Sequence, residues 1–129
     1  MSRMYPNKFL LQLNFPNHNG RVYSKNQIES ALLKAPNPLI GLIGECTERI
    51  PPSGRMAYTI TNLRIEGDAL FGDAAPLDTT AGKLFQRLFD DIGQDQFAFA
   101  INGSGNINEK GEVSDFTFHS VRLVRAGQV

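Results

Sequence analysis

The stretch 56-MAYTITNLRIE-66 alternates β-branched or aromatic residues with polar ones, which is the period-2 pattern of a β-strand with one buried face. Gly67 and Asp68 follow it as a turn signal, and the segment 69–75 then resumes an extended apolar chain. The sequence therefore predicts a β-hairpin over residues 56–75.

Four further segments predict strands, because they are short, rich in large apolar residues and bounded by Gly, Pro or Asn: 8–13, 39–46, 96–101 and 113–124. In the last one the apolar residues change face between the pair Phe116 and Phe118 and the pair Val121 and Leu123. Such a change predicts a β-bulge near His119 and Ser120. The residues expected in the core are Leu84, Leu88, Phe97, Phe99, Phe116 and Phe118.

Two helices are predicted, over about 25–34 and 80–92. Ser24 is followed three residues later by Gln27, which is the spacing of a capping box at a helix start. In the second helix the apolar residues recur at helical spacing, and Gly93 stands where a left-handed C-terminal residue belongs. The chain is thus expected to be a mainly β, α+β domain, mostly antiparallel, with two helices.

Composition limits the function classes. The 129 residues carry 13 Lys and Arg against 13 Asp and Glu, so no general positive field favours nucleic acid. One cysteine, Cys46, excludes an internal disulfide, and with two histidines it leaves too few ligands for a structural zinc site. We expect a soluble single domain of a reducing compartment, without metal, cofactor, signal peptide or membrane span.

Few residues are candidates for chemistry at neutral pH. His18 lies between two asparagines in an expected turn, which favours a solvated role. His119 shares an alternation face with polar neighbours, so it points either to solvent or into a polar pocket. The segment 102–105, which contains Ser104, is interpreted as a glycine-rich turn, because no G-x-S-x-G or Walker pattern surrounds it. Cys46 is expected to be a small buried hydrophobe.

Five short segments, in this order, resemble the prohead maturation proteases of tailed bacteriophages: 19-NGRVYS-24, 43-IGE-45, 70-LFGD-73, 79-TTAGKL-84 and 113-VSDFTF-118. The resemblance runs from about Asn17 to Val124. It implies the fold of the herpesvirus assemblins, a small antiparallel β-barrel flanked by two helices. The expected organisation is one domain over 1–129, with an extended N-terminal arm over 1–6 and the barrel over 7–124.

The catalytic positions of that family do not carry over to this chain. The resemblance places Glu48 where the family has its histidine base, and Ala100 and Ile101 where it has two serines. A methyl group cannot attack a carbonyl, and a carboxylate with an ordinary pKa of about 4.3 is a poor base at neutral pH. The alternative is a relocated nucleophile at Ser104 with His119 as its base.

These observations favour a non-catalytic virion protein, such as a decoration, cement or minor capsid protein, made in the host cytoplasm and located in the phage head. The alternatives are a divergent prohead serine protease and an intracellular phage binding protein. Expected partners are capsid or other virion proteins, with a homo-oligomer left open and neither nucleic acid nor membrane involved. The candidate partner-binding residues form the arm and a proline loop: Met1, Ser2, Arg3, Met4, Tyr5, Pro6, Pro51 and Pro52.

Overall fold

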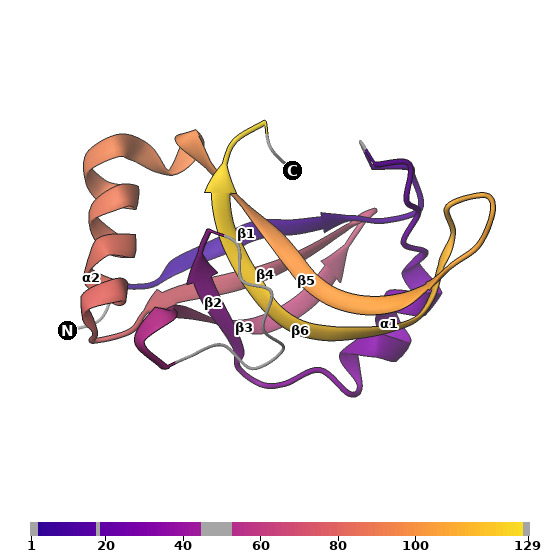
Figure 1. The fold of residues 1–129 in the computed structure, drawn as a ribbon, viewed down its shortest axis with the longest axis horizontal. Coiled ribbons are helices and arrows are strands. Elements are labelled where there is room, and N and C mark those ends of the chain that lie inside the picture. Colours follow the sequence, from indigo (N-terminus) through magenta and orange to yellow (C-terminus); the bar gives the residue numbers. More distant parts are fainter. Residues whose placement is uncertain (1–2, 18, 45–52, 128–129) are drawn as a thin grey trace.

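The computed structural model, which describes residues 3–17, 19–44 and 53–127, contains one six-stranded sheet that curls into a half-barrel (Figure 1). The strand order is β1-β4-β3-β2-β6-β5, so β1 and β5 are the edges. The strands and helices are β1 (Tyr5–Gln12), α1 (Lys25–Leu32), β2 (Leu39–Ile43), β3 (Met56–Glu66), β4 (Ala69–Pro76), α2 (Thr80–Arg87), β5 (Phe97–Ile107) and β6 (Val113–Arg125). The expected fold class, mainly β with two helices, is confirmed.

The predicted hairpin is present as β3 and β4, which pair in antiparallel register from Tyr58 opposite Pro76 to Glu66 opposite Ala69. One strand pair departs from the expected antiparallel barrel, because β2 and β6 run parallel and pair through Gly41 and Val121. The connection between β2 and β6 passes through the β3–β4 hairpin, α2 and β5, so it is long enough for the two strands to lie side by side in the same direction.

Both predicted helix starts are confirmed. Ser24 Oγ accepts a hydrogen bond from Gln27 N at 3.2 Å, and Thr79 Oγ1 accepts one from Gly82 N at 2.9 Å. The Gln27 side chain does not return to the cap, since its Oε1 accepts from Asp115 N at 3.2 Å and ties α1 to β6. After α2 the chain continues as a π-helical turn over Leu88–Gly93, which ends at Gly93 with φ 118°.

The core lies between the inner face of the sheet and the two helices, and its aromatic part lies under α2. Tyr58 stacks on Phe85 with ring centroids 4.4 Å apart, and Phe85 contacts Phe89 at 4.6 Å. Of the residues predicted for the core, Phe99 and Phe118 are buried, and Leu88, Phe97 and Phe116 pack against it partly buried. The prediction that Leu84 is buried is wrong, because this side chain is 49% exposed. It precedes Phe85 by one residue, which turns it about 100° away from the buried face of α2.

The predicted glycine-rich turn over 102–105 is wrong, and the predicted bulge is confirmed. β5 continues through this segment to Ile107 and pairs with β6 throughout. Gly103 suits a strand here because an added Cβ would lie 2.4 Å from the Thr117 carbonyl oxygen. Its neighbour Asn102 pairs with Ser120, whereas Gly103 pairs with Phe118, so His119 is the extra residue of a β-bulge.

The expectation that residues 1–6 form an arm without packing partners is also wrong for the described part of that segment. Strand β1 begins at Tyr5, three residues earlier than predicted, and pairs there with Ala74 of β4. Tyr5 is 4% exposed, and its ring contacts Phe89 edge-on at 4.9 Å. Its hydroxyl donates to Asp90 Oδ1 at 3.0 Å, and Arg3 Nη1 pairs with Asp90 Oδ2 at 2.6 Å. Met1 and Ser2 lie outside the described residues.

Asp73 on β4 accepts hydrogen bonds from residues at irregular positions of both neighbouring strands, β1 and β3. Asn7 on β1 and Asn62 on β3 both have positive φ, 58° and 54°, and both lie at register shifts. Asp73 accepts from Asn7 N at 3.0 Å, from Asn62 Nδ2 at 3.2 Å and from Arg64 Nη1 at 3.2 Å. The Asn7 N–H contributes most to lowering the pKa of this carboxyl below its ordinary 3.8, and Asn62 and Arg64 add to it.

We predict that Tyr5 anchors the N-terminus to α2. Replacing Tyr5 with Ala should lower the free energy of unfolding by about 3 kcal/mol, because it removes a buried ring. Tyr5→Phe keeps the ring and should cost about 1 kcal/mol through the lost hydrogen bond to Asp90. Urea denaturation of both variants measures this. Equal, small losses would contradict the packing of Tyr5.

A second prediction concerns pH. Since the folded-state pKa of Asp73 is lowered, its stabilising contribution is present above the unfolded value of 3.8 and is lost as the pH falls through the lower folded value. Asp73→Asn should therefore lower the melting temperature at pH 7, and the gap from wild type should close below about pH 4. Thermal melts between pH 2 and pH 7, roughly the range over which carboxyls titrate, test this. A gap independent of pH would contradict it.

Candidate functional site

The positions that the family resemblance assigns to the nucleophile lie in the middle of β5. Ala100 is 6% exposed and pairs with Arg122 of β6, whereas Ile101 is half-buried and pairs with Val121. Residues directly opposite each other on paired strands share a face of the sheet, so Ala100 and Arg122 lie on the outer face and Ile101 and Val121 on the inner one. Glu48, assigned to the base position, lies outside the described residues, as do His18, Cys46, Pro51 and Pro52.

A row of polar side chains follows Ala100 on the outer face. Arg122 Nη1 donates to Asn102 Oδ1 at 2.5 Å, and Asn102 Nδ2 donates to Ser120 Oγ at 3.0 Å. Ser120 is 2% exposed and is the buried polar residue of this part of the sheet. Asn102, Ser120 and Arg122 were not among the site residues predicted from the sequence. The only sequence feature that could have indicated them is the alternation of polar residues in the segments of β5 and β6. That alternation identifies neighbouring side chains only when the register of the two strands is known.

Ser104 and His119 lie next along the same strands. His119 Nε2 and Ser104 Oγ are 3.1 Å apart, within hydrogen-bond distance. The bulge at His119 brings about this approach, because Ser104 pairs with Thr117 in register and His119 is the inserted residue. The structure thus brings together the two residues of the alternative catalytic pair. A serine hydroxyl bound to an imidazole is the arrangement that activates serine nucleophiles.

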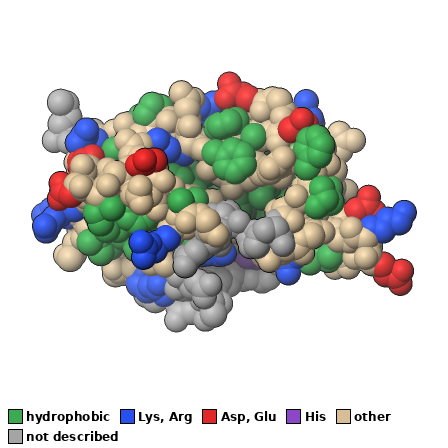
Figure 2. Space-filling view, turned by 90° about the horizontal axis from the view of Figure 1, so that it is seen from above, with side chains coloured by type: hydrophobic (Ala, Val, Ile, Leu, Met, Phe, Trp, Pro, Cys, Tyr) green, Lys and Arg blue, Asp and Glu red, His purple; other side chains and the backbone are tan. Residues whose placement is uncertain are grey.

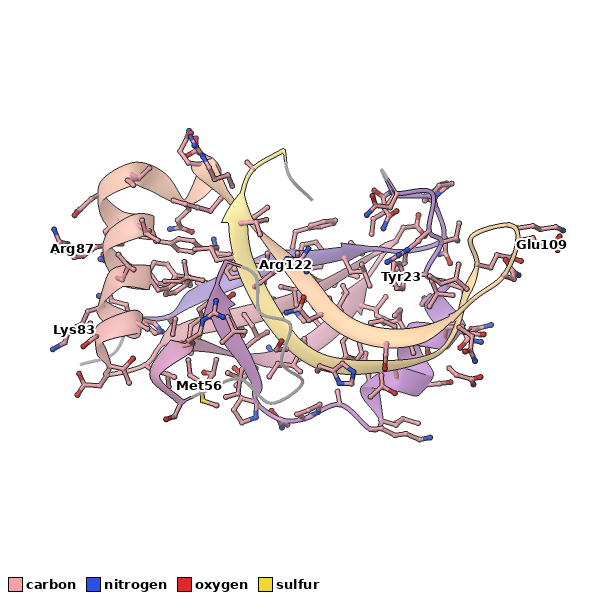
Figure 3. The ribbon with its side chains drawn as sticks, viewed as in Figure 1. Tyr23, Met56, Lys83, Arg87, Glu109 and Arg122 are labelled. Atoms are coloured by element: carbon pink, nitrogen blue, oxygen red, sulfur yellow. The ribbon has the colours of Figure 1, made fainter. Side chains whose placement is uncertain are left out.

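Two cavities flank this polar row. The larger, about 460 Å³, lies at the ends of β2 and β6 and is lined by Ile43, Gly44, Phe97, Arg122, Leu123, Val124 and Arg125. Figure 3 labels Arg122 on β6. Arg55 Nη2 donates to the Ile43 carbonyl at the margin of this cavity at 3.5 Å. The smaller, about 190 Å³, lies beside Ser104 and is lined in addition by Arg21, Tyr23, Gly103, Gly105, Ile107, Val113 and Phe116.

The electrostatics of the larger cavity are set by arginines. Arg122 Nε is buried and has no hydrogen-bond partner within residues 3–17, 19–44 and 53–127. On the inner face of the sheet, Tyr58 OH donates to the Leu42 carbonyl at 3.1 Å. Burial raises the pKa of Tyr58 well above 10, and the bond to Leu42 and the charge of Arg122 only partly oppose this. Tyr58 is therefore neutral and offers Arg122 no counter-charge.

Within residues 3–17, 19–44 and 53–127, no three or more His, Cys, Asp or Glu side chains gather as metal ligands would. Over the same ranges, no helix has the length and apolar character needed to cross a membrane. The described part of the site consists of serine, histidine, asparagine and arginine side chains on β5 and β6.

Comparison with known proteins gives one informative result. No protein-family model matches the chain, and no curated protein matches it. Among solved structures, the capsid assembly protease of bacteriophage T4, gp21, is similar with a TM-score of 0.74 and 20% sequence identity. The similarity covers 92% of this chain and 79% of that protein. The chain therefore has the fold of a phage capsid assembly protease, and this structural similarity supports the resemblance of its short segments to the phage prohead proteases.

Proposed function

We propose that this chain is a non-catalytic structural protein of the phage head, built on the fold of a prohead protease. The observation that carries the proposal is Ala100, a methyl-bearing residue that is 6% exposed at the position the resemblance assigns to the nucleophile. Arg122 is its partner across the strand pair. A packed methyl beside an arginine supplies no attacking oxygen and no base.

The proposed partners are capsid or other virion proteins. The similar T4 protein is described as a capsid assembly protease. A chain that has this fold but no catalytic groups is left with a role in capsid assembly. This step is an analogy between folds. A neutral chain of 129 residues suits binding to protein better than binding to DNA.

The edge strand β1 is the surface that we assign to the partner, in place of the loose arm. Phe9 on β1 is 49% exposed and contacts Phe71 of β4 edge-on at 6.0 Å. Figure 2 shows exposed hydrophobic side chains in several groups on the face seen from above. An edge strand with an exposed apolar side chain can accept a strand from another protein.

A second candidate function is supported by the contact between Ser104 and His119. The 3.1 Å separation of Oγ and Nε2, with the 190 Å³ cavity alongside, would suit a serine hydrolase with a relocated nucleophile. Such an enzyme would be a divergent prohead protease. Reactivity of Ser104 distinguishes it from the structural protein.

We predict that a serine-reactive fluorophosphonate labels the folded protein no more than a heat-denatured control, because position 100 carries no hydroxyl. Mass spectrometry of the treated protein locates any adduct. Labelling at Ser104 that disappears in His119→Ala would overturn the structural proposal and establish the hydrolase in its place.

We predict that the protein is present in purified phage particles and that β1 attaches it. Wild type should co-sediment with heads depleted of this protein. Phe9→Lys should reduce the bound fraction at least about tenfold, because a charge on an exposed edge strand opposes strand addition. Leu33→Lys is the matched control, since Leu33 is 88% exposed and directly follows α1, which packs mainly against β6. Equal loss in both variants, or absence of the protein from particles, would contradict the proposal.

A further inference from the structure

The guanidinium of Arg122 is incompletely satisfied. It is fixed by one hydrogen bond, from Nη1 to Asn102 Oδ1, and Asn102 is in turn held by Ser120. Its Nε is buried and has no hydrogen-bond partner in the described part of the chain. Buried donors without partners are rare in folded proteins, so each one calls for an explanation, and a functional role is one of the recognised explanations. The described side chains therefore hold this arginine in place without satisfying it.

Arg122 also has no carboxylate partner among the residues that the structure describes. Among the described residues, carboxylates form ion pairs with Arg3, Arg64 and Arg87, and none does so with Arg122 or Arg125. The partner of Arg122 is a neutral amide, and Tyr58 nearby stays protonated. Two arginines thus line one cavity with no acidic side chain of the described chain paired to either of them.

The remaining walls of that cavity are largely apolar. Ile43, Phe97 and Val124 line it together with the two arginines, and its volume is about 460 Å³. This volume is in the range of pockets that hold small ligands, which are mostly apolar with a few polar groups that fix orientation. A carboxylate beside an apolar residue matches both parts of this lining.

From these observations we propose that the cavity between Arg122 and Arg125 binds a carboxylate of a partner protein, with an apolar neighbour of that carboxylate against Phe97 and Ile43. The planar, multiply donating guanidinium suits the two oxygens of a carboxylate. Arg122, which lines the cavity, pairs with Ala100 across β5 and β6. The strand pair to which the resemblance assigns peptide cleavage thus carries peptide recognition in this chain. In this one respect the inference rests on the proposed non-catalytic function.

The carboxylate has two sources in a protein, an acidic side chain or the C-terminus, and both offer the same chemistry. Three six-residue peptides of otherwise uncharged sequence, acetylated at the N-terminus and containing one Phe, separate them. The first has an internal Glu and an amidated end, the second has Gln in its place, and the third has Gln and a free C-terminal carboxylate. Isothermal titration calorimetry with the full chain measures their affinities.

The Glu peptide or the free-carboxylate peptide should bind at least about tenfold more tightly than the amidated Gln peptide, which corresponds to about 1.4 kcal/mol. Arg122→Gln should reduce that preference about tenfold. Arg125→Gln should also reduce it, and because Arg125 is exposed this variant retains the test if Arg122→Gln fails to fold. Arg87→Gln is the matched control, since Arg87 lies on α2 far from Arg122 (Figure 3).

Equal affinity for all three peptides would overturn the inference, as would an Arg87→Gln variant that weakens binding as much as Arg125→Gln. Competition by inorganic phosphate but not by acetate would also overturn it and indicate a phosphate site. These outcomes are distinct from failure of the proposed function, which is decided by labelling of Ser104 and by the protein content of particles.

Discussion

The stacking of Tyr58 on Phe85 is the contact on which the other parts of the structure depend. It joins β3 to α2 at 4.4 Å, and it is feasible only because Gly41, opposite Tyr58 on β2, has no side chain. A Cβ at Gly41 would lie 1.9 Å from the ring. Gly82 plays the same part on α2, where a Cβ would lie 1.9 Å from the Leu77 carbonyl oxygen. Helix and sheet can therefore meet closely enough to exclude water.

This inner packing determines which side chains reach the outer face. Because Phe99, Val121 and Leu123 are committed to the core, alternation places Ala100 and Arg122 on the other side of β5 and β6. The bulge then changes the parity of β6, so that His119 turns outward toward Ser104. The polar row on the outer face is thus a consequence of burying aromatic residues on the inner face. The same register of β5 and β6 positions the core residues and the site residues.

The sequence predicted those features that depend on neighbours along the chain. Periodicity and turn residues were sufficient for the β3–β4 hairpin, for the cap at Ser24, for the start of the second helix at residue 80 and for the bulge at His119. What it missed depends on distant partners. Gly103 is in a strand because Phe116 and Thr117 approach it, and Tyr5 is buried because α2 lies over it. The cross-strand pairing of Arg122 with Ala100 likewise has no signature in the local pattern.

Strand geometry also bears on the two candidate functions. Ala100 and Ser104 are four residues apart on β5, which is about 13 Å along a strand. Active sites tolerate only displacements well below about 1 Å. Groups arranged around position 100 therefore cannot activate a nucleophile at position 104. A hydrolase at Ser104 would need its own substrate groove and its own donors for the oxyanion. The hydrogen bond between Ser104 and His119 has a simpler use, because it holds the inserted residue of the bulge against the neighbouring strand.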